Sequence, residues 1–244
     1  MAQSIAINVG ANTNLPGVRG PIYPDGSFVY LPIPEREPTT EPVPTYADLL
    51  DRLDPLPVSV DDLRDRRVHL DPEFADYPTC SRYTYGDEHG VKAGPLSELR
   101  RGDSLFFYAT LGRHDPPAGV DTGPPVDWVA PDWGAYLIGE FRVDRVFDAD
   151  ACANLSAFDR HGVDTNAHCK RDPFDAKVLV VGSDGSQLFD RAVPLSAPDS
   201  GSTANRLVTE LSNDSGKGPW WRRRLWFDED ATERLRAVVD GESE

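Results

Sequence analysis

Lysine is scarce in this chain. The 244 residues contain four lysines against 21 arginines and 29 aspartates, and the formal net charge is −16. An acid excess of this kind keeps a protein soluble at the cost of self-repulsion, as in halophilic organisms. The composition therefore predicts a halophilic protein of the kind found in haloarchaea. In molar salt the Debye length falls to about 3 Å, so the overall charge does not exclude a local site for an anion or for nucleic acid.

Cysteines and long apolar runs are also few. Cys80, Cys152 and Cys169 are odd in number and scattered, so a disulfide framework is not expected. No apolar run approaches the roughly 20 residues of a membrane span. The start MAQSIAINVG lacks the basic and apolar segments of a signal peptide. We therefore expect a cytoplasmic protein that makes no contact with a membrane.

Strand patterns outnumber helix patterns. Extended segments are predicted at residues 4–9, 104–111 and 133–148, and residues 175–195 predict a hairpin that turns at Ser183-Asp184-Gly185. Strands and helices do not alternate regularly. This arrangement favours an α+β fold with a few peripheral helices around a mixed or antiparallel strand-rich sheet, or around a sheet curled into a barrel.

Helix signals are clearest at two places. Thr45 and Asp48 form a capping box at the start of one helix, and Asp230 is the expected cap of a C-terminal helix. An Asp25-Gly26 turn between apolar arms predicts a second hairpin.

The chain shows no internal repeat and no clear boundary, so we expect one domain over residues 1–244. Within it, residues 30–45 predict an extended surface linker segment. Residues 112–134 form a long loop rich in proline and glycine, and connections of this length are usually functional or mobile.

The first candidate site is the glycine-, proline- and asparagine-rich segment near the N-terminus. Asn8 and Asn12 offer neutral donors and acceptors, and the guanidinium of Arg19 suits a phosphate or a carboxylate. Glycine would let a ligand approach the main chain closely. The alternative is a structural loop held by local Asx turns.

The second candidate is the segment RVHLDPEF. His69 and Asp71 share a face if the segment is extended, so they could act as a base and its orienting carboxylate, or both could hold a metal. The alternative is a capped turn at Asp71-Pro72 with His69 packed sideways.

Two later segments are more ambiguous. CANLSAFDRHGVDTNAHCKRD contains Cys152, His161, His168 and Cys169, but their spacing matches no common zinc template, so no metal is predicted there. GPWWRRRLWF could stack bases on tryptophans and clamp phosphate with arginines, or could form an amphipathic strand with Trp221 inward. No nucleophile triad and no nucleotide-cofactor motif are present, so no cofactor is expected.

Taken in order, six segments resemble the nucleotide modification associated domain 3 (Nmad3) family of bacteria, phages and archaea. They are GVRGPIYPDGSFVYLPIPE, VHLDPEF, LRRGDSLFFYATLG, AYLIGEFRVDRV, NAHC and PWWRRRLWFDED. The central strands also resemble the strand pair of PUA-like barrels. The Nmad3 resemblance implies a role around modified nucleotides without fixing a reaction, and partner proteins of a modification system. It points to Arg19, Asp25, His69, Asp71 and His168 as polar positions that converge.

Two hypotheses follow. In the first, the protein binds a modified or flipped base of a nucleic acid or nucleotide, with Tyr108, Trp133 or Trp221 stacked on it. In the second, it is an enzyme in which Asp71 orients His69 as general base and Arg19 holds phosphate. A structural role inside a modification complex is a third option. The first two require the N-terminal segment and the His69–Asp71 segment to form opposite walls of one recess.

Overall fold

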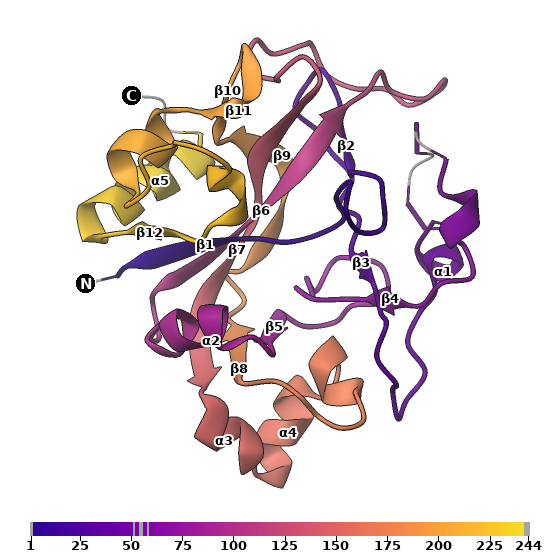
Figure 1. Cartoon of the computed structure of the whole chain (residues 1–244), viewed down its shortest axis with the longest axis vertical. Helices are drawn as coiled ribbons and strands as arrows, with labels where there is room; N and C mark the ends of the chain where they lie inside the picture. Colours follow the sequence, from indigo (N-terminus) through magenta and orange to yellow (C-terminus); the bar gives the residue numbers. More distant parts are fainter. Residues whose placement is uncertain (1, 51, 54–55, 58, 242–244) are drawn as a thin grey trace.

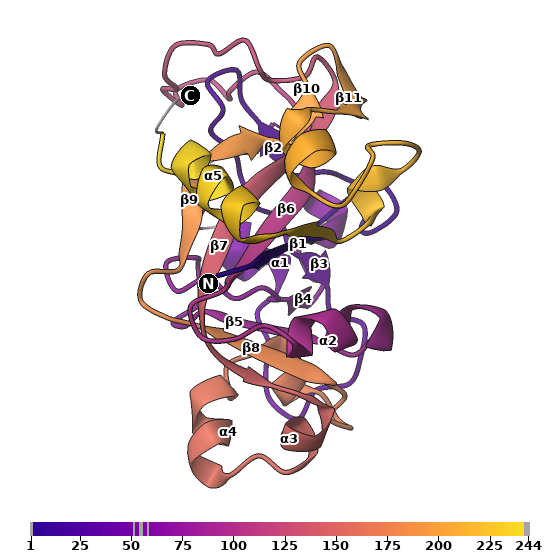
Figure 2. The same ribbon diagram turned by 90° about the vertical axis from the view of Figure 1, so that its left-hand side faces the viewer.

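The computed structural model describes residues 2–241 except residues 51, 54–55 and 58. An eight-stranded mixed sheet occupies the centre of the molecule (Figures 1 and 2). Its two longest strands, β6 (Ser104–Arg113) and β7 (Trp133–Phe147), pair antiparallel, and β1 (Ser4–Asn8) runs parallel to β6. The other strands of this sheet are β2 (Pro21–Ile22), β5 (Thr84–Asp87), β8 (Val178–Gly182), β9 (Gln187–Pro194) and β12 (Leu225–Phe227).

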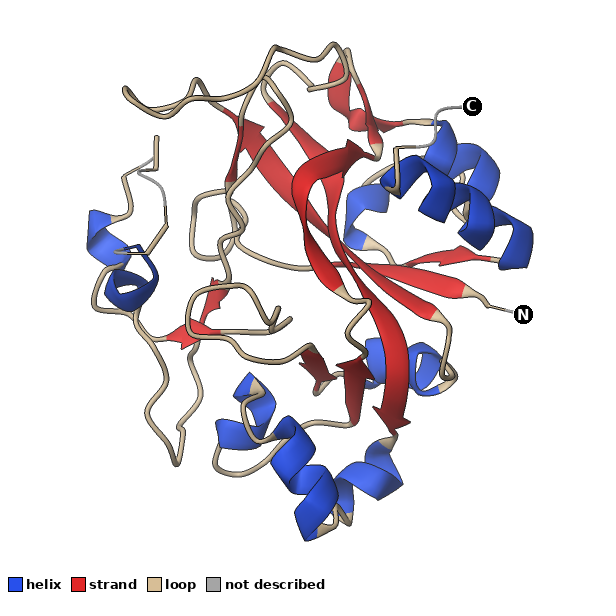
Figure 3. Ribbon diagram, turned by 180° about the vertical axis from the view of Figure 1, so that it is seen from behind, coloured by secondary structure: helices blue, strands red, loops and turns tan. Residues whose placement is uncertain are grey.

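The sheet is open. Its strand order is β12-β1-β6-β7-β8-β5, with β2 added to β6 and β9 to β7. In the described residues β12 and β5 form the two ends of this order and do not pair with each other, as the view from behind shows (Figure 3). The strand-rich α+β prediction is therefore confirmed, and the PUA-like barrel alternative is wrong.

Smaller elements surround the sheet. Two short pairs are formed by β3 (Ile33–Pro34) with β4 (Val68–His69), and by β10 (Ser196–Ala197) with β11 (Ser200–Ala204). The helices are α1 (Tyr46–Leu50), α2 (Gly90–Ser97), α3 (Ala149–Ala153), α4 (Ala157–Val163) and α5 (Glu229–Val239). Shorter helical turns are η1 (Asp61–Leu63), η2 (Ala167–Lys170), η3 (Leu207–Leu211) and η4 (Trp220–Arg222).

Both faces of the sheet are covered, which explains why β6 is almost continuously apolar. Leu105 and Phe107 face a core that includes Phe74 and the α1 segment, whereas Phe106 faces a second core built around Trp220. Figure 1 shows α5 on one side of the sheet and α1, β3 and β4 on the other. The chain segments before β5 and after β9 thus form two separate covering layers.

Both predicted helices are present in the structure, but the residue that caps the C-terminal helix differs from the expected one. Thr45 and Asp48 form the capping box of α1, although part of the helix expected there lies outside the described residues. Helix α5 is capped by Asp228, whose side chain accepts a hydrogen bond from the amide of Ala231, so the expected cap at Asp230 is two residues late.

The hairpin predicted over residues 175–195 is wrong. β8 pairs with Val143–Phe147 of β7, and β9 pairs with Tyr136–Glu140 of the same strand, so the chain runs on along β7 instead of turning back. An Asp-Gly hairpin turn requires a positive φ at glycine, and Gly185 is not among the residues with that conformation. The Asp184-Gly185 segment therefore acts as a bulge between two strands that share one partner.

The expected linker and loop both make specific contacts. Residues 36–42 are largely exposed, but Glu35 is buried and lies beside His69. In the 112–134 segment, the amide of Gly123 donates to the carboxylate of Asp25 and the amide of Val126 donates to the carbonyl of Pro24. The middle of this long connection is thereby fixed against the Asp25 turn.

Over the residues that the structure describes, every helix is too short or too polar to cross a lipid bilayer.

A glycine in β11 tests the packing of the sheet. A Cβ added to Gly201 would lie 1.7 Å from the carbonyl oxygen of Trp133, whereas one added to Gly162 in α4 would meet open space. We expect Gly201→Ala to lower the free energy of unfolding by at least about 1–3 kcal/mol, because backbone atoms must move apart. Gly162→Ala should be neutral or slightly stabilising, since alanine favours helix. Urea unfolding of both variants measures the difference, and equal midpoints would contradict the close approach of β11 to β7.

Candidate functional site

Two adjoining cavities lie where β1 ends, and both are lined by Asn8 and Asn12. The first, here the histidine pocket, has a volume of about 260 Å³ and is lined also by His69, Asp71 and His168. The second, here the arginine pocket, has a volume of about 250 Å³, and Arg19, Trp221 and Arg222 contribute to its walls. Each is slightly smaller than the roughly 300–1,000 Å³ of most small-molecule sites, so the two together are the size of a small ligand.

The walls of the histidine pocket come from distant parts of the chain. Residues 8–12 leave the sheet at the end of β1 and form one side. In the short β3–β4 pair Ile33 lies opposite His69. This pairing places Glu35, which follows β3, and Asp71, which follows β4, in the same region. His168 is contributed by η2, whose N-cap Asn166 accepts a hydrogen bond from the amide of His168.

Each buried histidine is held by a carboxylate. His69 Nδ1 lies 2.6 Å from Glu35 Oε2, and His168 Nδ1 lies 2.7 Å from Asp175 Oδ1. The two rings meet edge to face with centroids 4.9 Å apart. Hydrogen bonds to ionised carboxylates place the ring hydrogen of both histidines on Nδ1, which leaves Nε2 of a neutral ring as an acceptor.

The pKa values of the two carboxylates support this assignment. Burial alone would raise the pKa of Glu35, but the hydrogen bond from His69 and the charge of His69, together with bonds from Arg171, lower it to about 2. Burial also acts to raise the pKa of Asp175, and hydrogen bonds from His168 and Arg171 lower it below the ordinary value. Both groups are therefore ionised at neutral pH.

Asp71 and His168 influence each other across the pocket. Burial raises the pKa of Asp71, an effect that the charges of His168 and His69 offset only in part. Burial would lower the pKa of His168, but the hydrogen bond to Asp175 and the charge of Asp71 raise it above the ordinary value. A basic histidine beside a carboxyl group of raised pKa can pass a proton to or from a ligand.

Arg171 connects the two histidine–carboxylate pairs. Its guanidinium binds Glu35 through two bonds of 3.1 and 3.2 Å, and it also binds Asp175 at 2.7 Å and Glu88 at 2.5 Å. Burial acts to lower the pKa of Arg171, but the hydrogen bonds and charges of Glu35 and Asp175 raise it above its ordinary value. The charge of Arg171 is thus fully compensated inside the protein.

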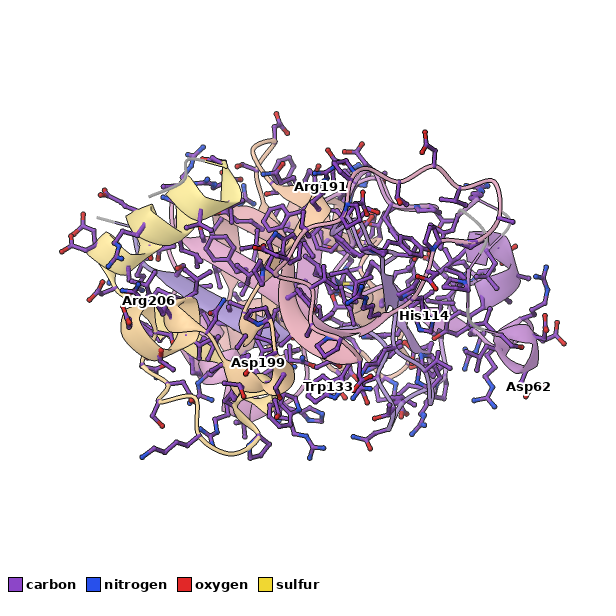
Figure 4. The ribbon with its side chains drawn as sticks, turned by 90° about the horizontal axis from the view of Figure 1, so that it is seen from above. Asp62, His114, Trp133, Arg191, Asp199 and Arg206 are labelled. Atoms are coloured by element: carbon purple, nitrogen blue, oxygen red, sulfur yellow. The ribbon has the colours of Figure 1, made fainter. Side chains whose placement is uncertain are left out.

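The arginine pocket holds cationic and aromatic groups. Arg19 lies over the ring of Trp133, labelled in Figure 4, at 4.5 Å from its centroid, and the ring of Trp221 meets that of Trp133 edge to face at 5.2 Å. Arg222 is exposed, and its guanidinium forms no hydrogen bond or ion pair with a described residue. Buried Nδ2 of Asn8 and Nε of Arg19 also have no hydrogen-bond partner in the described chain. These groups are donors without acceptors, so a ligand with oxygen acceptors would complete them.

The structure brings most of the candidate residues to these cavities. Asn8, Asn12, His69, Asp71 and His168 line the histidine pocket, and Arg19 and Trp221 line the arginine pocket. The carboxylate that orients His69 is not the one expected from the sequence. Glu35, and not Asp71, forms the hydrogen bond with His69.

Three candidates lie outside both cavities. Trp133 lines neither, and its ring contacts Arg19 and Trp221, which line the arginine pocket. Tyr108 is fully buried between the sheet and the C-terminal layer, and its hydroxyl donates to the backbone carbonyl of Arg223, so it cannot stack on a ligand. Asp25 is buried in its turn, where it accepts hydrogen bonds from Ser27 and Gly123. Its role is structural.

Sequence analysis missed Glu35, Arg171 and Asp175. Glu35 closes the Pro-Ile-Pro-Glu string, which has the composition of a surface linker. Arg171 and Asp175 follow His168 by three and seven residues. They lie in a charged segment, and charged segments are common throughout this acidic chain. Their proximity to His168 was the available signal.

The fold and these cavities define an α+β protein with an open mixed sheet and a cavity lined by buried titratable residues. The chain matches the family model described as nucleotide modification associated domain 3 over residues 3–243, nearly its whole length, and it belongs to that family. No curated protein and no solved structure matches it. The family description associates the chain with nucleotide modification.

Replacing Arg171 tests how far the site depends on its charge. We expect Arg171→Met to lower the free energy of unfolding by about 3–5 kcal/mol, because it leaves the buried carboxylate of Glu35 and its neighbours uncompensated. Arg206→Met is the matched control, since Arg206 pairs with Glu210 on the exposed surface (Figure 4) and should change stability little. Thermal unfolding of both variants measures the effect. Equal loss in the two variants would show that Arg171 is no more important than a surface arginine.

Proposed function

We propose that this protein binds a nucleotide, or a base flipped out of a nucleic-acid strand, across the two cavities and acts on it by acid–base chemistry. The observation that supports the proposal is that the two cavities share lining residues. Asn8 and Asn12 line both the cavity of buried histidine–carboxylate pairs and the one lined by arginines, so the two cavities adjoin and a single ligand is proposed to span them.

The arginine pocket has the chemistry of a phosphate site. Arginine binds phosphate through a planar fork of donors. Nε of Arg19 and the guanidinium of Arg222 have no acceptor among the described residues. Trp221 adds a ring on which a base can stack. The membership of the chain in a family associated with nucleotide modification supports a nucleotide over other phosphate-bearing ligands.

The histidine pocket favours catalysis. A pocket for recognition alone is expected to have aromatic walls and neutral amides, whereas Tyr85 is the only phenylalanine, tyrosine or tryptophan among the described residues that line this one. Its titratable groups instead include two histidines that are each oriented by a carboxylate. In the proposed mechanism Nε2 of His69 removes a proton from the ligand or from a water, and His168 supplies one.

Recognition without a reaction is the second candidate. Trp221 and the amides of Asn8, Asn12 and Asn14 in the arginine pocket suit the edge and face of a modified base, so they favour this function. The protein would then bind a modified nucleic acid and release it unchanged, as a module of a larger modification system.

A turnover assay separates the two functions. The protein is incubated with nucleosides, nucleotides and single-stranded DNA or RNA that carry modified bases, and products are identified by liquid chromatography and mass spectrometry. If the protein is an enzyme, His69→Gln should lower the rate by about 10²–10⁴-fold, the usual contribution of a general base. His161→Gln is the control, because His161 is exposed on α4. Binding without any product would favour recognition, and full turnover by His69→Gln would remove His69 from the mechanism.

A binding assay tests the phosphate site. We expect Arg222→Ala to weaken binding of a nucleoside monophosphate by about 10–100-fold, the loss of a charge-assisted hydrogen bond, and to leave binding of the matching nucleoside unchanged. Arg206→Ala, on the surface near η3, should change neither affinity. Calorimetric titration measures both ligands. Equal weakening of nucleoside and nucleotide would contradict a phosphate at Arg222.

A further inference from the structure

We propose that His69, Asp71 and His168 together bind one divalent transition-metal ion in the histidine pocket. Each side chain offers one ligand atom, and the three atoms lie within 4.8 Å of one another. Two histidines and one carboxylate are the ligand set of several catalytic zinc sites and of non-haem iron sites. The sequence left open a metal held by His69 and Asp71 but predicted none at His168, which lies almost 100 residues from His69 and comes near it only in the fold.

The histidines are oriented as metal ligands require. A histidine that binds a metal through one nitrogen nearly always donates its other ring hydrogen to a carboxylate or carbonyl, which fixes the ring. Here Nδ1 of His69 is bound to Glu35 and Nδ1 of His168 to Asp175. The structure shows no hydrogen bond from a described residue to Nε2 of either ring. Both Nε2 atoms are therefore available for the same ion.

Asp71 is also held by the protein through one of its oxygens, which leaves the other oxygen for a metal. Its Oδ1 accepts hydrogen bonds from the amide of Gly86 at 2.8 Å and from Nδ2 of Asn166 at 2.9 Å. Its Oδ2 is left 3.8 Å from Nε2 of His168. Two ligands that bind one ion tetrahedrally at about 2.1 Å lie about 3.4 Å apart, so a movement of a few tenths of an ångström brings this pair to coordination distance.

The charge around the site favours a cation. Five carboxylates line the pocket or hold its histidines, against two cationic side chains. The carboxylates belong to Glu35, Asp71, Asp87, Glu88 and Asp175, and the cations to Lys92 and Arg171. The guanidinium of Arg171 contacts Nδ1 of both histidines at 3.3 Å, so it lies on the side of the rings away from Nε2. A metal ion at Nε2 would thus reduce the negative excess without approaching Arg171 directly.

A second group of potential ligands is less suitable. Glu88, His168 and Asp175 also lie close enough to share an ion. However, Arg171 already binds the carboxylates of Glu88 and Asp175, and an ion there would have to displace its guanidinium. The geometry therefore assigns the ion to the group that contains Asp71.

Three protein ligands would leave coordination positions open toward the cavity. A water or an oxygen of the bound nucleotide would occupy them, and the ion would act as a Lewis acid on that group. With the ion bound, the Nε2 atoms of His69 and His168 are ligands, so a metal-bound water would take over the proton transfer that the free histidines would otherwise perform. This catalytic role rests on the proposed function, but the binding of the metal does not.

Direct metal binding tests the inference without any nucleotide. The full chain, freed of affinity tag and treated with chelator, is titrated separately with Zn²⁺, Co²⁺ and Mn²⁺, and bound metal is measured by mass spectrometry and by the visible spectrum of Co²⁺. We expect one ion per chain for at least one of these metals. Asp71→Asn and His168→Gln should weaken its binding by at least about 100-fold. Glu35→Gln should weaken it by about 10–100-fold, as for partners of metal-bound histidines. His161→Gln should leave it unchanged.

The outcomes separate this inference from the proposed function. Wild-type protein that is folded by circular dichroism and binds none of the three ions overturns the metal site, whether or not it turns over nucleotides. The same conclusion follows if the ion binds equally well to Asp71→Asn and His168→Gln. One ion per chain, lost in these variants, supports the site even if no nucleotide binds. Where a variant fails to fold, the Co²⁺ spectrum of the wild type decides, since nitrogen and oxygen coordination changes that spectrum from the aqueous ion.

Discussion

The buried charge of Arg171 is the constraint on which the candidate site depends. Its guanidinium joins Glu35 beside β3, Glu88 after β5 and Asp175 after η2, three segments that are far apart in the sequence. A buried ion pair adds little net stability, but removing one partner is costly. The same carboxylates Glu35 and Asp175 orient His69 and His168, so one guanidinium fixes the position of both histidines.

The sheet provides the place for this cluster. β6 and β7 are buried on both faces, and the N-terminal and C-terminal segments cover opposite sides. The chain leaves the sheet at the end of β1, after Asn8. The cavities lie at this end of β1. The N-terminal layer contributes His69 and Asp71, and the segment between β7 and β8 contributes His168 and Arg171. The C-terminal layer contributes Trp221 and Arg222. A chain with a net charge of −16 thus has arginine donors without an acceptor among the described residues at the edge of a pocket of buried histidines and carboxylates.

Short sequence patterns predicted those elements whose structure depends on neighbouring residues alone. The strands around Phe107 and Phe141 follow from apolar runs, and the start of α1 follows from Thr45 and Asp48. The error at Asp184-Gly185 arose because β7 is long enough to pair with two successive strands, a property that no local turn motif records. Glu35 was missed for a similar reason, since its burial depends on Arg171, 136 residues away.

The glycines and asparagines of the N-terminal segment have different roles in the structure. Gly10 has a φ of +78°, and a Cβ there would lie 2.9 Å from the ring of Tyr30, so this glycine serves close packing against the protein's own chain. The asparagines are not equivalent. Asn12 closes a turn by accepting hydrogen bonds from the amides of Asn14 and Leu15, whereas Nδ2 of Asn8 is buried without an acceptor. A buried donor with no partner costs stability unless a ligand supplies an acceptor. Asn8 lines both cavities, so it is the residue of this segment best placed to bind the proposed ligand.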